Sequence, residues 1–172
     1  PVEPSRKQGL ALPSHPVVLT RALLLINLLL FVITSLLSRG GFMEAVLGGA
    51  DGLTLIALGA KENSLILQGE YWRLLTPIFL HIGIVHLLFN SYALNLFGRE
   101  VEGLFGSWRF AVVYFLSGIA GSLLSFAFSP NTSAGASGAI FGVIGAMAAF
   151  LIRNRETLGA QGRQHLQSLA FM

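Results

Sequence analysis

Ser137 is the residue of this sequence best placed to act as a nucleophile. It lies in the run Gly135-Ala136-Ser137-Gly138, so its hydroxyl is flanked by residues with almost no side chain. Backbone N–H groups at a helix start stabilise negative charge, and the flanking glycines leave the hydroxyl accessible. The same position also suits an ordinary helix N-cap, in which the small neighbours serve only packing. Position alone leaves both interpretations open.

His86 and Asn90 form a polar pair that could assist such a serine. Their spacing of four places them within about 40° of each other on a helix, so both side chains point the same way. An imidazole N–H and an amide NH₂ are fixed donors that suit an oxyanion in a water-poor site. The alternative is that each hydrogen-bonds a neighbouring helix and holds a bundle together.

Other chemistries fit the sequence less well. His81 lies five residues before His86, so on a helix the two side chains would point in different directions, and we expect no metal site. We expect His81 to be a structural partner for loop backbone. The chain has no cysteine, hence no thiolate nucleophile and no disulfide framework. No cofactor is expected. The apolar spans hold no carboxylate to complete a triad, so serine chemistry would require a Ser-His dyad.

The elements that must position these residues are membrane helices. With 53% hydrophobic and 11% charged residues, the chain has too little polar surface for a water-soluble globule. The sequence therefore predicts an all-α, polytopic transmembrane helical bundle. Apolar stretches near the roughly 20 residues needed to cross the hydrocarbon core predict four spans, and a fifth begins near residue 166. The four predicted spans are 17–37, 74–97, 110–128 and 136–152.

The basic residues indicate how the chain is oriented. Most of them flank the segments that share a side with the N-terminus, which places that terminus in the cytoplasm. Residues 1–16 are then a cytoplasmic tail, and residues 17–172 are the transmembrane domain. The connection 38–73 lies on the other side, where Tyr71 and Trp72 favour a folded, membrane-associated loop. The charges form no continuous patch, so we expect no nucleic-acid partner.

Four motifs, in order on the expected spans, carry a resemblance to a known family. They are Glu70 to Arg73, His81 to Asn90, Gly98 to Gly106, and Gly135 to Gly138. Together they resemble the signatures of rhomboid intramembrane serine proteases. The resemblance covers the chain from about Val17 onward and implies a core of six helices.

The resemblance implies roles for particular residues. Ser137 resembles the family's nucleophile, while His86, Asn90 and the Ser137 backbone N–H resemble its oxyanion hole. His81 resembles a structural histidine. Four further residues resemble positions that support the site: Trp72 and Arg73 the motif that anchors the first loop, Glu102 the glutamate that fastens the end of the second span, and Phe141 the aromatic ring that packs on the catalytic imidazole.

The family's catalytic base has no counterpart in this sequence. In the family it is a histidine on the sixth helix, and Gly142 resembles the glycine that lets that helix pack closely. His15 lies in the tail and His165 on the cytoplasmic side, so neither is expected to replace it. We therefore expect the chain to be a fragment of a longer protease and to be inactive alone.

The resulting prediction is an intramembrane serine endopeptidase that cleaves transmembrane substrate proteins through an acyl-enzyme. Its partners would be those substrates and the lipid bilayer, and its location the cell membrane. The sequence leaves the oligomeric state open. The alternative is a catalytically inactive rhomboid-like protein that binds transmembrane helices, although a binder needs none of Ser137, His86 and Asn90. A channel or transporter fragment would not explain the serine motif, and the spans carry no acidic relay residue.

Overall fold

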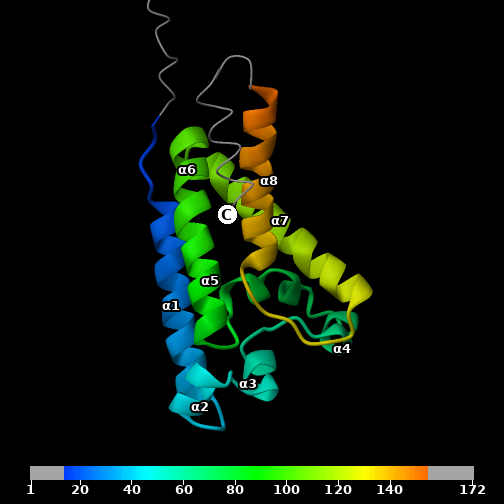
Figure 1. The fold of residues 1–172 in the computed structure, drawn as a ribbon. Helices are drawn as coiled ribbons and strands as arrows, with labels where there is room; N and C mark the ends of the chain where they lie inside the picture. The colour runs from blue at the N-terminus through cyan, green and yellow to red at the C-terminus, as the bar shows by residue number, and fades with distance from the viewer. Residues whose placement is uncertain (1–13, 155–172) are drawn as a thin grey trace, which may run out of the picture.

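The apolar stretches of the sequence form the long helices of a bundle, and short helices gather at one end of it (Figure 1). The structure is a computed structural model and describes residues 14–154. The elements of these residues are, in chain order, α1 (Leu19–Leu37), α2 (Phe42–Leu47), α3 (Gly52–Ala57), α4 (Asn63–Leu67), η1 (Tyr71–Leu74), η2 (Thr76–Phe79), α5 (Ile84–Ala93), η3 (Leu94–Gly98), α6 (Arg99–Phe105), α7 (Ser107–Phe128) and α8 (Ser137–Arg153).

The helical fold class is confirmed for the described residues, whereas the predicted number of spans is not. By length and composition, two described helices could cross a membrane, α1 and α7. Helix α8 is apolar but shorter, at 17 residues. The fifth span predicted near residue 166 lies outside the described residues.

The predicted span 74–97 is wrong over its first ten positions or so, because the α-helix there begins only at Ile84. Residues 76–79 form a 3₁₀ turn that contains Pro77, and Leu80 and Gly83 are extended. Proline supplies no backbone N–H and favours an extended residue before it, so a continuous helix through this segment is disfavoured. His81 therefore lies on a loop, whereas His86 and Asn90 lie on α5.

The connection 38–73 is folded. In Figure 1, α2 and α3 lie at the lower ends of α1 and α5, and α4 lies to the right of them, under the end of α7. Asp51 caps α3 by accepting the Thr54 N–H at 3.0 Å, and its other oxygen accepts the Arg39 N–H at 2.9 Å. The Thr54 hydroxyl also donates to Asp51, and these hydrogen bonds hold the pKa of that carboxyl below its usual range. The end of α1 is thus fastened to the start of α3.

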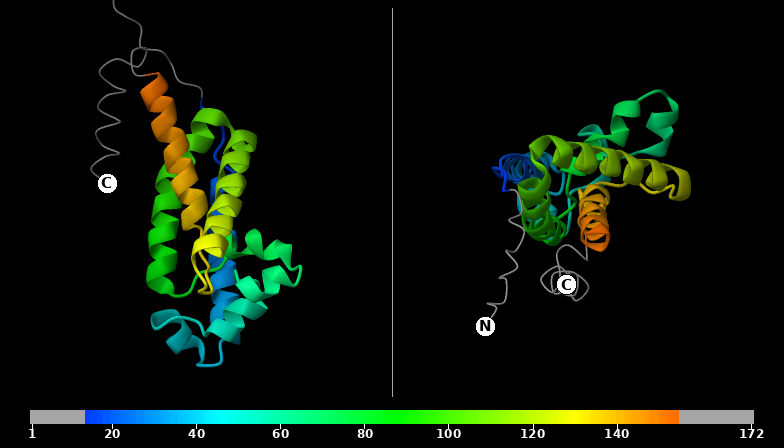
Figure 2. Two further views of the ribbon diagram at one scale, coloured as in Figure 1. Left: turned by 90° about the vertical axis from the view of Figure 1, so that its right-hand side faces the viewer. Right: turned by 90° about the horizontal axis from the view of Figure 1, so that it is seen from above.

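Helices α7 and α8 pack backbone against backbone beside the site. A Cβ added to Gly121 would lie 3.1 Å from the Gly138 Cα, and Gly142 lies directly against Ser117. Small residues let transmembrane helices approach this closely. Both views of Figure 2 show α7 crossing α8 at an angle. The start of α8 is therefore held rigidly against α7.

Glu102 fastens the opposite end of the bundle. Its side chain is fully buried, and its carboxylate accepts the backbone N–H groups of Val18, Leu19 and Thr20 at 3.0, 2.7 and 2.8 Å. The Ser107 hydroxyl donates to it at 2.5 Å. A carboxylate at a helix N-terminus satisfies donors that have no intrahelical partner. Burial raises the pKa of Glu102, but these hydrogen bonds outweigh it and the pKa is lowered.

We expect Glu102→Gln to lower the free energy of unfolding by about 2 kcal/mol, since a buried charge-assisted network loses its acceptor charge. Because the folded pKa is lowered, this contribution is present above the ordinary glutamate range and is lost as the pH falls through the folded pKa. Thermal unfolding in detergent across the acid range should show a smaller pH dependence in the variant. The control is Glu44→Gln, at an exposed glutamate; equal effects from both changes would contradict this role for Glu102.

Candidate active site

Ser137 is the first residue of α8, and its side chain is exposed. The cap position is taken by Ala136, and no side chain caps this helix. The interpretation of Ser137 as an ordinary N-cap is therefore wrong. Its hydroxyl makes no hydrogen bond to any residue that the structure describes, while its backbone N–H lies in the first turn, where N–H groups have no intrahelical partner.

Gly135 brings the α5 imidazole to the loop before Ser137. Its φ of +137° lies in a region that favours glycine, and an added Cβ would lie 2.6 Å from the His86 Cε1 and 2.7 Å from Nε2. The Gly135 N–H donates to the Pro77 carbonyl at 2.8 Å. The His86 ring on α5 thus packs against Gly135, which lies only two residues before Ser137 in the chain.

Asn90 lies one turn after His86 on α5, as its spacing predicted. Its side chain is 6% exposed, and its Nδ2 donates to the His86 carbonyl at 2.9 Å. An amide nitrogen carries two N–H donors, so one remains for another acceptor. His86 and Asn90 therefore present two neutral donors from a single helix.

His81 is fully buried, and its ring centroid lies 5.3 Å from that of His86. The prediction that a five-residue separation turns these two rings apart is wrong, because His81 precedes the helix and the loop folds it back over α5. Within residues 14–154, no group of three His, Asp or Glu side chains could hold a metal ion.

A pocket of about 240 Å³ opens beside Ser137. Its lining is made of small residues, the Ser137 hydroxyl and one aromatic ring, that of Phe141, which is 72% exposed. The lining residues are Pro77, Gly118, Gly121, Ser122, Ser125, Ser133, Ala134, Gly135, Ser137, Gly138 and Phe141. Sequence reasoning missed that α7 lines this pocket. The signal was present, because Gly118 and Ser122, like Gly121 and Ser125, are four residues apart and so form a small-residue face of a helix.

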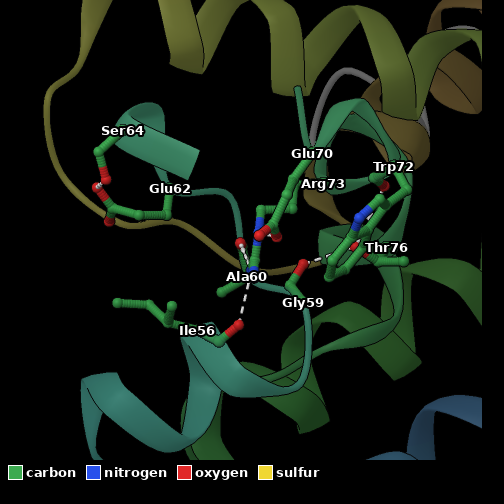
Figure 3. Close-up of polar contacts among 9 residues, drawn as sticks. All are labelled: Ile56, Gly59, Ala60, Glu62, Ser64, Glu70, Trp72, Arg73 and Thr76. Carbon is green, nitrogen blue, oxygen red and sulfur yellow. Dashed lines mark hydrogen bonds and ion pairs between the residues drawn. The ribbon is translucent and has the colours of Figure 1, made fainter. Parts of the chain in front are cut away.

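Arg73 fastens the loop 38–73 from within (Figure 3). It is 5% exposed, and its Nη1 donates to the carbonyls of Ile56 and Ala60 at 2.6 and 3.0 Å. Its Nε pairs with Glu70 at 2.6 Å, and its guanidinium lies 4.4 Å from the centre of the Trp72 ring. A buried guanidinium with carbonyl and carboxylate acceptors holds several chain segments in one geometry.

Comparison with known proteins gives one consistent result. Residues 68–172 match the Rhomboid domain family. The chain is 57% identical to the rhomboid protease GluP of Bacillus subtilis over 116 residues, which are 67% of this chain and 23% of that protein. It is 42% identical to RHOMBOID-like protein 5 of Arabidopsis thaliana over 129 residues, 73% of this chain and 42% of that one. A putative rhomboid protease of Bacillus subtilis, YdcA, is 42% identical over 98 residues, 56% of this chain and 49% of that protein. The chain thus spans less than half the length of these relatives.

Proposed function

The chain belongs to the rhomboid family, and on that premise we propose that it forms part of an intramembrane serine protease in which Ser137 is the nucleophile. The observation that carries the proposal is the convergence of Ser137, His86 and Gly135 at the start of α8. A serine whose hydroxyl makes no hydrogen bond within residues 14–154, which lines a pocket and lies two residues after a glycine packed against the His86 ring, is an arrangement that packing alone does not require.

In the proposed reaction the Ser137 Oγ attacks the carbonyl carbon of the scissile peptide bond. The carbonyl oxygen gains negative charge and accepts hydrogen bonds from His86, Asn90 and the Ser137 backbone N–H. The attack forms a tetrahedral intermediate. When this intermediate collapses, it expels the amine of the cleaved bond and leaves an acyl-enzyme ester, which water hydrolyses to free the serine.

The proton from the serine passes to a base that no described residue supplies. His81 is fully buried on the loop before α5, His86 is proposed as an oxyanion donor, and His15 lies near Gly106 at the opposite end of α7 from the pocket. We place the base on a helix outside residues 14–154, as the family resemblance implies. Phe141, exposed one turn after Ser137, is proposed to support it. Gly142 does not face that helix as the resemblance implied, because it packs against Ser117 of α7.

The substrates are proposed to be transmembrane proteins. The pocket beside Ser137 has room for a small side chain, because glycines and serines form most of its wall. The apolar helices α1 and α7 support placement of the protein within a membrane. The further parts of this proposal are the cytoplasmic N-terminus, a cell-membrane location and a loop 38–73 that rests on the outer face.

The direct test of the activity is cleavage of a single-span reporter protein by the whole protein in liposomes. We expect a product cut within or next to the reporter's span. Capture of the reporter without any cleavage would instead support the inactive, helix-binding alternative.

We expect Asn90→Ala to slow cleavage by roughly a hundredfold, the usual loss for one oxyanion donor. The change should appear in kcat, because the donor acts on charge that develops in the transition state. The matched control is Ser91→Ala on the next position of α5, whose rate should match that of the unsubstituted protein. An unchanged rate in the Asn90 variant would leave Asn90 with a packing role only.

A further inference from the structure

Lys61 is a buried cation that the proposed chemistry does not use. It lies between α3 and α4, and its side chain is fully buried. Lysines are almost never fully buried unless their charge is paired, so its hydrogen-bond partners matter. Its Nζ donates to the carbonyls of Ser129 and Asn131, at 2.8 Å each. Burial lowers the pKa of Lys61, and the neighbouring Glu62 carboxylate partly offsets this by raising it. The ammonium is thus anchored in the loop that connects α7 to α8.

The main chain of Lys61 reaches the same loop. Its N–H donates to the Ser133 carbonyl at 2.9 Å, and the Ser133 N–H donates back to the Lys61 carbonyl at 3.1 Å. This pair forms an isolated antiparallel bridge two residues before Gly135. Lys61 therefore fixes the segment 129–133 through both its side chain and its backbone.

The two residues after Lys61 extend this contact. The Thr132 hydroxyl donates to Glu62 at 2.6 Å, and this hydrogen bond lowers the pKa of Glu62. The Asn63 Nδ2 donates to the carbonyls of Phe126 and Ser129, at 3.2 Å each. Three consecutive residues of one loop thus hold the end of α7 and the chain that follows it.

Arg73 holds the residue just before Lys61. Figure 3 shows its guanidinium reaching the Ala60 carbonyl on the segment that continues into Glu62. Arg73 therefore holds Ala60 within the loop 38–73, and the next residue, Lys61, holds the segment 129–133. Beyond that segment, the Gly135 N–H is bonded to Pro77, and α8 starts with Ser137.

We propose that Lys61 is a positioning residue for the nucleophile: its hydrogen bonds to the segment 129–133 hold Gly135 and Ser137 in register with His86. The inference rests on the proposed function of Ser137. It gives the loop 38–73 a direct part in the geometry of the site. Because the reacting groups must be aligned closely, a small displacement of this segment slows the chemical step more than it weakens binding.

The test uses Lys61→Met in the whole protein, which keeps the length of the side chain and removes its donors. Hydrogen exchange followed by mass spectrometry should show the amides of residues 129–136 exchanging about tenfold faster or more, since charge-assisted hydrogen bonds are lost. Labelling of Ser137 by a fluorophosphonate should lose about tenfold to a hundredfold in its maximal rate, with the half-saturating probe concentration unchanged.

Arg39→Met is the matched control, because it removes an exposed cation from the same loop, and it should change neither measurement. Asn63→Ala serves if Lys61→Met does not fold, and should raise exchange in the same segment by a smaller factor. Unchanged exchange at 129–136, exchange raised equally throughout α7 and α8, or faster exchange with an unchanged labelling rate would each overturn the inference. If the unsubstituted protein does not label at all, the proposed nucleophile fails, and the exchange data still decide whether Lys61 fixes the loop.

Discussion

Replacing Ser137 with alanine is expected to abolish proteolysis while leaving the fold intact. Loss of the nucleophile in a serine hydrolase lowers kcat by roughly a millionfold, which is below detection in a membrane assay. The hydroxyl is exposed and makes no hydrogen bond within the described residues, so the free energy of unfolding should change by no more than about 0.5 kcal/mol. Cleavage of a single-span reporter and thermal unfolding measure the two quantities.

This prediction separates chemistry from packing at one position. Ser122→Ala on α7 is the control, because Ser122 lines the same pocket from the facing helix and has no proposed reaction step. It should retain cleavage. Activity that survives in the Ser137 variant would remove the nucleophile assignment, and unfolding of that variant would show that the serine serves the fold.

Gly135→Ala is expected to have the second-largest effect. A residue with a side chain at φ +137° is strained by about 1–3 kcal/mol. Its Cβ would also overlap the His86 imidazole, which must then move. Displacing one oxyanion donor costs roughly a hundredfold in kcat. We therefore expect both a lower melting temperature and a loss of activity of at least about that size.

Gly145→Ala is the matched control for Gly135→Ala. Gly145 lies on α8, and an added Cβ there meets nothing within 4 Å among the described residues. Alanine is a better helix former than glycine, so this variant should be as stable as the unsubstituted protein or slightly more stable. Full activity in the Gly135 variant would show that the contact with His86 does not matter for catalysis.

The sequence predicted much of the fold because its dominant signal is apolar length. Helices α1 and α7 match predicted spans closely. The segment 74–83 could not be predicted in the same way. Its apolar residues indicate a membrane span, whereas the structure has a 3₁₀ turn with Pro77 followed by the extended Leu80. Hydropathy reports where a chain is apolar and does not distinguish helix from turn in a short apolar run.

In the candidate site, the contacts within one helix could be predicted from the sequence, and the contacts between distant segments could not. The pairing of His86 with Asn90 depends on spacing along one helix and was predictable. The approach of His81 to His86 depends on a folded loop, and the anchoring of Lys61 depends on a contact between segments about 70 positions apart in the chain. No local pattern in the sequence encodes such a contact.

The central claim is that Ser137 is an activated nucleophile. Its most direct test is to react the whole protein in detergent with a fluorophosphonate and to identify the modified residue by mass spectrometry. We expect a single phosphonylated residue, Ser137, and no adduct after heat denaturation. An adduct on a different serine, or none in a folded sample, would contradict the claim and favour a rhomboid-family protein that binds transmembrane helices without cutting them.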